Sequence, residues 1–356
     1  MRARFREFVN IGPMTDTWQH QLKSLGATLT DGFVQHFGDP VNDLTAAENS
    51  TILADLSHLG LIQVSGTDAL TYLQGQLTQD VEKITEERAA FAGHCSPKGR
   101  LLAHFLAWKS DDRYFLQLPR ELIEPIQKRL KMYVLRSKVV LADVSSAHIR
   151  FGVGGENAAN VIASVFADVP AHPMDIVRSP KGTVIALPNG RFQILVSGDA
   201  ADVWQTIAKN AAPAGEAVWR WLQIRAGIPE IYIATQEQFV PQMINDDLIG
   251  AVSFQKGCYT GQEIVARLHY LGKAKRRMVG AHLDIADAPR PGDAIYGQRL
   301  EGQAIGMVVD AAAAPRGGWD LLVSVPVEEN VEPVHYFKAP HGPELIINSF
   351  KINKMN

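Results

Sequence analysis

Alternating apolar and polar positions in the first part of the chain predict short strands separated by amphipathic helices. Residues 59–65 read LGLIQVS, which is typical of a strand. A helix follows after Asp68, because apolar residues recur at steps of three and four between Leu70 and Val81. Further strands are predicted at 89–94, 101–107 and 114–118, and a second helix at 120–133.

The same order of elements then partly repeats. Strands are predicted at 148–153, 183–187 and 191–197, and helices at 157–166 and 200–211. Two strand–helix–strand–strand–helix units in succession predict a related pair of mixed α+β domains.

The pattern changes near Lys273. Short apolar runs at 278–283, 294–295, 304–309 and 321–325 are separated by Gly and Pro, and helical periodicity is absent. This texture predicts a small all-β domain, a barrel. A cluster of basic residues, Arg267, Lys273 and 275–277, precedes it. The cluster is either a solvated face or a docking patch for an anionic ligand tail or an RNA backbone.

Composition narrows the class of protein. The 356 residues include 35 Lys and Arg against 38 Asp and Glu, and only two cysteines. The near-neutral balance argues against a nucleic-acid coat protein, and two cysteines exclude a disulfide framework. Residues 1–13 lack the apolar core of a signal peptide, Met14 is a candidate second start, and no segment has a membrane-spanning apolar run. A cytoplasmic protein with two or three domains is expected.

The segment richest in potential chemistry is residues 256–263, KGCYTGQE, called the Cys258 loop below. Its glycines allow close approach of the backbone to a ligand. Lys256 and the predicted helix that begins at Gln262 both favour a thiolate at Cys258 over a thiol. Cys95 ends a strand pattern and is expected to be a packed core thiol.

Other catalytic and cofactor motifs are missing from the sequence. Residues 152–157 lack the third glycine of a dinucleotide-binding loop, and no Walker A or G-x-S-x-G sequence is present. The eleven histidines form no H-x-H or H-E-x-x-H pair, so no metal site is predicted.

The Cys258 loop resembles the K-G-C-[YF]-x-G-Q-E signature of the YgfZ-type folate-binding proteins, relatives of the glycine cleavage T-protein, an aminomethyltransferase. Residues 66–80, the turn CSPKGR at 95–100 and the blocks 226–229 and 238–242 resemble other parts of that family. The resemblance implies an α+β fold: two intertwined ferredoxin-like-type domains around a central folate cavity, followed by a C-terminal β-barrel. It implies a discontinuous first domain of residues 14–145 with 214–272, a second domain of 146–213, and a barrel of 273–356.

The resemblance also assigns site residues. Trp219 matches the tryptophan that lines the family's pterin site, whereas Arg225 stands where many members carry a glutamate. Arginine cannot accept a hydrogen bond, so either the ligand pose differs or another acceptor serves. Cys258 and Lys256 would be catalytic. The remaining ligand-binding candidates are Tyr259, Gln262, Glu263 and Arg267.

The T-protein's aspartate pair falls at Ala103 and His104, so ordinary aminomethyltransferase activity is not expected. The leading hypothesis is a tetrahydrofolate-binding accessory protein that supports iron–sulfur enzymes and tRNA modification, with iron–sulfur client or assembly proteins and tRNA as partners. A folate-dependent one-carbon transferase and a non-catalytic folate-binding regulatory module are the alternatives.

Overall fold

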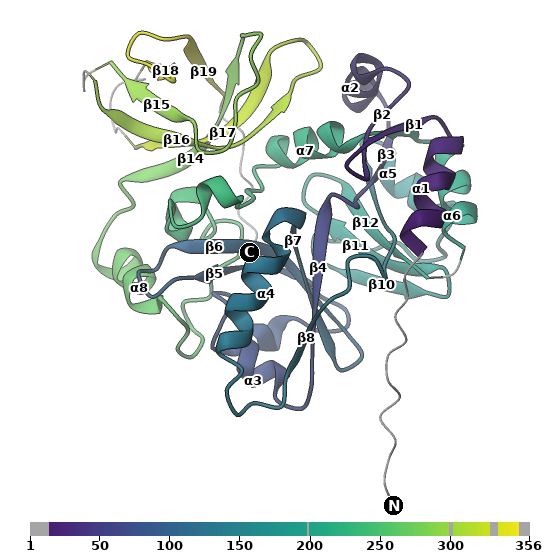
Figure 1. The fold of residues 1–356 in the computed structure, drawn as a ribbon, viewed down its shortest axis with the longest axis horizontal. Helices are drawn as coiled ribbons and strands as arrows, with labels where there is room; N and C mark the ends of the chain where they lie inside the picture. Colours follow the sequence, from purple (N-terminus) through teal and green to yellow (C-terminus); the bar gives the residue numbers. More distant parts are fainter. Residues whose placement is uncertain (1–13, 198, 299–301, 328–333, 349–356) are drawn as a thin grey trace, which may run out of the picture.

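The computed structural model describes residues 14–197, 199–298, 302–327 and 334–348. Two β-sheets lie side by side beneath a small barrel (Figure 1). Helix α7 (Glu216–Arg225) runs beneath the barrel, between it and the sheets. This arrangement confirms the predicted α+β class with a C-terminal β-barrel. The predicted start near Met14 concerns residues 1–13, which lie outside the described residues.

The five-stranded sheet forms the first layer and has the order β5-β6-β7-β4-β8. Its strands are β4 (Leu59–Ser65), β5 (Ala90–Cys95), β6 (Leu101–Ser110), β7 (Arg113–Pro119) and β8 (Val140–Asp143). Helices α3 (Ala69–Gln74) and α4 (Ile123–Met132) and the 3-10 turns η1 (Val81–Lys83) and η2 (Arg120–Leu122) accompany it. Ile123, Ile126 and Leu130 of α4 are buried in the core of this unit.

The six-stranded sheet has the order β10-β11-β12-β9-β3-β13. Its strands are β3 (Ile52–Asp55), β9 (Arg150–Gly154), β10 (Ile176–Ser179), β11 (Gly182–Leu187), β12 (Arg191–Val196) and β13 (Ala212–Ala214). Helices α5 (Ala158–Ala163) and α6 (Ala200–Ala208) belong to the same unit. Trp18, Phe151 and Trp204 pack together in its core, with ring centroids 5.0–5.6 Å apart.

The N-terminal segment joins this second unit. It consists of α1 (Met14–Ser24), the hairpin of β1 (Ala27–Thr30) and β2 (Phe33–Phe37), α2 (Pro40–Asn49) and β3. Strand β3 pairs with β9 and, in parallel, with β13. The sequence grouped residues 14–55 with the first domain. Strand pairing places β3 in the sheet of the second unit, and the domain boundaries themselves stay a prediction.

The barrel closes in the order β14-β17-β16-β15-β18-β19. Its strands are β14 (Arg276–Leu283), β15 (Ala294–Gly297), β16 (Ala304–Ala313), β17 (Trp319–Pro326), β18 (His335–Phe337) and β19 (Glu344–Asn348). Between α7 and the barrel the chain forms η3 (Ile233–Thr235), η4 (Pro241–Ile244) and α8 (Gln262–Leu271). In the described residues, no helix is long and apolar enough to cross a membrane.

One predicted helix is shorter than its apolar periodicity suggested. Helix α3 ends at Gln74, so Leu77 and Val81 are buried outside it, while Leu70 is 37% exposed. Leu77 instead forms a β-bridge with His94 of the neighbouring strand. Apolar residues at steps of three and four are compatible with a longer helix and also with a turn that leads into an extended segment. Pairing with the edge of the sheet favours the extended segment here. The sequence allowed either a strand or a helix around Trp219 and Trp221. Both residues lie on helix α7.

Candidate functional site

A cleft of about 1050 Å³ opens between the two α+β units. Phe91 of β5 lines one side, and Met174 and Asn189 of the second unit line another. The segment 249–255 and residues His269 and Tyr270 of α8 complete the rim. The cleft therefore brings together segments that are far apart in the sequence.

An inner chamber of about 30 Å³ lies where the two sheets meet. Phe91 and Ile228 line both the cleft and the chamber, so the two spaces are neighbours. Gln117 of β7 and Gln193 of β12 exchange two hydrogen bonds of 2.8 and 2.9 Å at the chamber wall. These amides join the two sheets directly beside the chamber.

Trp219 forms one wall of the chamber. Its side chain is 1% exposed and lies on Gly152 of β9. A Cβ atom at residue 152 would sit 2.5 Å from the indole ring, so glycine is needed for this close approach. The Arg191 guanidinium lies 5.4 Å from the centre of the ring, a cation–π distance. The predicted role of Trp219 as a ligand wall is compatible with this placement and stays a prediction.

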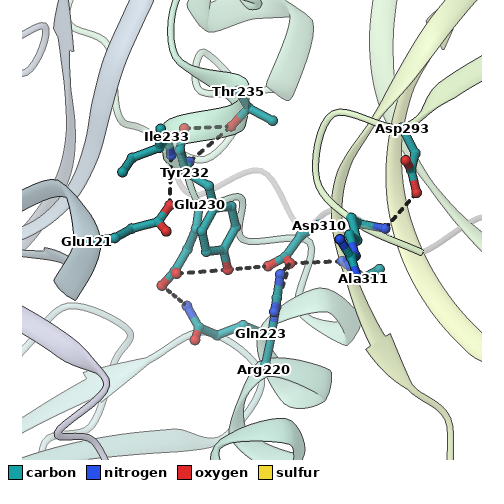
Figure 2. A network of polar contacts seen from close by, with 11 residues as sticks. Glu121, Arg220, Gln223, Glu230, Tyr232, Ile233, Thr235, Asp293, Asp310 and Ala311 are labelled. Atoms are coloured by element: carbon teal, nitrogen blue, oxygen red, sulfur yellow. Dashed lines mark hydrogen bonds and ion pairs between the residues drawn. The ribbon is translucent and has the colours of Figure 1, made fainter. Parts of the chain in front are cut away.

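Among the described residues that line this chamber, Glu230 is the only one with a carboxyl group. Gln223 Nε2 lies 2.9 Å from Glu230 Oε1, and the Tyr232 hydroxyl lies 3.2 Å from Oε2. Burial and the nearby charge of Asp310 raise the pKa of Glu230 to about 7. Figure 2 shows how these contacts continue through Tyr232 to Asp310 of β16 and Arg220 of α7.

A second buried pair borders the chamber. His104 of β6 lines it and stacks on Phe91, with ring centroids 5.4 Å apart. The Nε2 atom of His104 lies 3.4 Å from Oδ1 of Asp246, which is 0% exposed. Burial lowers the pKa of His104 to about 3 and raises that of Asp246 well above its ordinary value. Both shifts favour the uncharged forms of the two side chains, and neither His104 Nε2 nor Asp246 Oδ1 has a hydrogen-bond partner.

The two cysteine segments meet. Gly261 has a φ of +85° and begins α8. A Cβ atom there would lie 2.5 Å from the Ser96 carbonyl oxygen, so the Cys258 loop packs against the turn that follows Cys95. Both thiols are free. Cys95 is 0% exposed, which confirms the predicted core thiol, and burial raises its pKa. Cys258 is exposed.

Lys256 anchors the Cys258 loop to the first unit. Its Nζ donates to the carbonyl oxygens of Gln74, Leu77 and Gln79 at 2.7–2.9 Å and lies 5.2 Å from the centre of the Tyr259 ring. Burial lowers the pKa of Lys256 to about 8. A structural role is therefore evident, whereas its predicted effect on the Cys258 thiol stays a prediction.

The other predicted ligand residues lie outside the inner chamber. The Arg225 guanidinium lies 5.9 Å from the centre of the Trp221 ring, and Tyr259 is 7% exposed. Gln262 is partly buried and Glu263 is exposed at the start of α8, and Arg267 is exposed in the second half of that helix. Their predicted ligand roles stay predictions.

Sequence reasoning did not find Glu230, Arg191 or Asp246. Arg191 and Glu230 lie on different sides of helix α7 in the sequence, and Asp246 lies in the segment before the Cys258 loop. One signal in the sequence pointed toward an acidic residue elsewhere. Arg225 cannot accept a hydrogen bond, so another residue could supply the acceptor for the ligand. In the described residues, no group of three or more His, Cys, Asp or Glu side chains is placed to hold a metal ion.

We expect Lys256→Met to lower the free energy of unfolding by roughly 2 kcal/mol, because three carbonyl oxygens lose a charged donor. Urea unfolding measures the change. Lys98→Met is the matched control, since Lys98 is exposed in the neighbouring turn and should change stability by less than about 0.5 kcal/mol. Equal stability of the two variants would contradict the anchoring role.

Comparisons with known proteins agree with the fold described above. The family model "GCVT N-terminal domain" matches residues 34–215. The tRNA-modifying protein YgfZ of Colwellia psychrerythraea (strain 34H) is 34% identical over 229 residues, which cover 64% of this chain and 70% of that protein. The chain belongs to the family of YgfZ-type proteins with a GCVT N-terminal domain.

Two further relatives extend the comparison. The tRNA-modifying protein YgfZ of Shigella sonnei (strain Ss046) is 29% identical over 304 residues, or 84% of this chain and 92% of that protein. The crystal structure of the glycine cleavage system aminomethyltransferase T from Bartonella henselae has a TM-score of 0.73 at 18% identity, over 94% of this chain and 97% of that one. At that identity the likeness shows a shared fold. The T-protein structure and this chain thus share the same overall fold.

Proposed function

We propose that this protein binds a reduced folate between its two α+β units and acts with it in tRNA modification. The observation that carries the proposal is the wide cleft that meets a polar chamber walled by Trp219. The relatives named as tRNA-modifying proteins support the second half of the proposal.

The lining of the site fits a folate. A flat heterocycle would lie against Trp219, and the chamber offers buried polar atoms without a hydrogen-bond partner, among them Arg191 Nη1 and His104 Nε2. The apolar side chains of Phe91, Met174 and Ile228 would contact the aromatic middle of the ligand. A bound tetrahydrofolate would supply one-carbon chemistry, while these residues bind and orient it.

The exposed Cys258 would act at the mouth of this site. A thiolate there can accept a one-carbon unit, exchange disulfides, or ligate a transient cluster together with a partner. A single reactive thiol must take its remaining cluster ligands from another protein, so iron–sulfur client or assembly proteins are proposed as partners. With such partners the protein would act in the cytoplasm.

The tRNA would bind at the C-terminal end of α8. Arg267 and Lys275 are exposed there, and Tyr270 on the rim of the cleft is 65% exposed. Basic side chains beside an exposed aromatic ring suit a phosphate backbone with an unstacked base.

A one-carbon transferase is the second candidate, and the pair of His104 and Asp246 favours it. This pair brings a carboxyl group next to the position where the T-protein's aspartate was missing from the sequence, and it borders the chamber. Turnover of labelled methylene-tetrahydrofolate by the purified protein without partners would support this candidate over an accessory role.

Two measurements test the leading proposal. Titration of tetrahydrofolate should give saturable binding to wild type, and Trp219→Ala should bind at least tenfold more weakly because the ring wall is lost. Because Trp219 is a core residue, Trp219→Phe serves as the folded comparison and should bind with an intermediate affinity. Equal affinity of all three proteins would remove Trp219 from the site.

In a deletion strain, Cys258→Ser is expected to abolish restoration of the modified tRNA nucleoside and of iron–sulfur enzyme activity. Alkylation kinetics give the control, since Cys258 should react in the native protein and buried Cys95 only after unfolding. Full restoration by Cys258→Ser would favour the non-catalytic binding module instead.

A further inference from the structure

We propose that the end of helix α4 and the turn that follows it form a docking surface for an acidic protein segment that also carries aliphatic side chains. Six exposed residues make up this surface, called the α4 patch below: Lys128, Lys131, Met132, Leu135, Arg136 and Lys138. None of them lines the cleft or the inner chamber. The chain leaves α4 at the end of the molecule opposite the barrel (Figure 1). The inference therefore goes beyond the proposed function and does not depend on it.

The α4 patch concentrates positive charge in a chain that is slightly acidic. Residues 125–142 contain five Lys and Arg and no Asp or Glu, whereas the whole chain has a net charge of −3. Within the described part of the chain, no salt bridge reaches any of the four cations of the patch. Asp68 lies beside the patch, but its Oδ2 accepts from the backbone N–H of Lys138 at 2.7 Å. The cationic side chains are therefore available to an anionic partner.

The stability of α4 accounts for only part of this charge. Basic residues in the last turn of a helix interact favourably with its carbonyl end, and Lys131 belongs to the last turn of α4. The helix ends at Met132, and Arg136 and Lys138 lie in the segment beyond it, where the helix dipole has little effect. These two exposed cations have no evident role in the fold itself, which favours a role in binding.

Leu135 gives the α4 patch an aliphatic tip. The Ser137 N–H donates to the Val134 carbonyl oxygen at 2.7 Å, which closes a turn with Leu135 at its first central position. Leu135 has a φ of +42°, in the left-handed region that favours glycine, and the residue is 88% exposed. Its side chain therefore gains little from packing, in a backbone conformation that is unfavourable for leucine. Contact with a partner would account for both features.

The composition of the α4 patch indicates which class of partner it suits. Met132 adds a second aliphatic side chain, 59% exposed, one helical turn from Lys128. Proteins that bind unpaired nucleic acid stack its bases on aromatic rings. The one aromatic side chain nearby, Tyr133, is partly buried and has the Arg129 guanidinium 6.0 Å from its ring centre. Met and Arg are enriched in protein–protein interfaces, so carboxylates and aliphatic side chains of a protein match this surface.

The test uses a fluorescein-labelled amphipathic peptide of Glu and Leu, with a peptide in which Gln replaces every Glu as its partner. Fluorescence anisotropy should show saturable binding of the Glu peptide and at least tenfold weaker binding of the Gln peptide. Lys131→Glu combined with Arg136→Glu should weaken binding of the Glu peptide at least tenfold, because two attractive charges become repulsive. Leu135→Gly should weaken it at least threefold without lowering the urea midpoint, because glycine adopts a positive φ without strain.

A matched variant separates the α4 patch from overall charge. Lys23→Glu combined with Lys209→Glu changes the net charge by the same amount, and both lysines are exposed at the C-terminal ends of other helices. This variant should bind the Glu peptide like wild type. Near-UV circular dichroism checks folding, and Lys131→Gln combined with Arg136→Gln supplies a milder change that should still weaken binding at least threefold.

The outcomes distinguish this inference from its rivals and from the proposed function. Equal weakening by the two charge-reversed pairs would overturn the inference, because overall charge would then explain the binding. Loss of binding to unfractionated tRNA or to phosphatidylserine vesicles in Lys131→Glu/Arg136→Glu, with unchanged peptide binding, would overturn it too. Tetrahydrofolate binding should be the same in this variant and in wild type, so failure of the peptide test leaves the proposed function standing. If wild type binds the Glu peptide as expected but no tetrahydrofolate, the inference is supported and only the proposed function fails.

Discussion

Asp310→Ala is expected to lower the free energy of unfolding by about 3–5 kcal/mol, the range for breaking a buried ion pair. Asp310 is 1% exposed, and its Oδ1 accepts from Arg220 Nε at 2.6 Å. It also contacts the Tyr232 hydroxyl and accepts from the Ala311 backbone N–H at 2.8 Å. Alanine would leave the largely buried Arg220 guanidinium without its counter-charge. Urea unfolding monitored by tryptophan fluorescence measures the loss.

Two controls accompany this variant. Asp310→Asn keeps an acceptor oxygen for the Ala311 N–H but removes the charge, so an intermediate loss is expected. Asp293 also lies in the barrel, but its partner Lys338 has a side chain that is 49% exposed, and Asp293→Asn should cost less than about 1 kcal/mol. Similar losses for Asp310→Ala and Asp293→Asn would show that the contact between α7 and the barrel contributes little.

His94→Asn is expected to become more stable relative to wild type as the pH falls below 6.5. The His94 ring is 0% exposed, and burial lowers its pKa to about 4. His94 is therefore protonated near pH 6.5 in the unfolded chain, but only near pH 4 in the folded protein. The stability that wild type owes to neutral His94 is complete above pH 6.5 and is lost as the pH falls, by about 1.4 kcal/mol per pH unit.

The comparison must be made between variants at each pH, because other groups act in the opposite sense. The pKa of Glu230 is raised to about 7. Its contribution to the free energy of unfolding therefore decreases as the pH rises from the ordinary pKa of a glutamate toward 7. Asparagine at residue 94 can still donate to the Gln76 carbonyl oxygen, as His94 Nδ1 does at 2.9 Å. Urea midpoints at pH 7.5, 6.0 and 5.0 give the difference. A constant difference between the two proteins would contradict a buried neutral His94.

Local patterns predicted the elements whose burial is set by their own strand or helix face. The apolar run at 59–65 forms strand β4, and the change of pattern near Lys273 marks the start of the barrel. The pattern failed at α3, where spacing alone cannot tell a continued helix from a turn and a β-bridge at Leu77. It also missed β3, whose partners β9 and β13 lie far along the chain.

Some residues of the candidate site could be predicted from the sequence, and others could not. The Cys258 loop and Trp219 were found because they lie in short, distinctive sequences. Glu230, Arg191 and the pair of His104 and Asp246 have no such local signal, because their environment is formed by β6, β12, the segment after α7 and the segment before the Cys258 loop together.

The sequence by itself determined the strand and helix alternation, the barrel, the family resemblance and the presence of one distinctive cysteine loop. Only the tertiary structure decided that strand β3 joins the second sheet, that Lys256 anchors the loop to three carbonyl oxygens, and that a carboxylate and an unpaired guanidinium nitrogen share the chamber. The physical reason is the distance along the chain over which each interaction acts. Periodicity reports which side of a segment is buried, whereas the partners, charge and pKa of a buried polar group depend on distant segments that meet only in the folded chain.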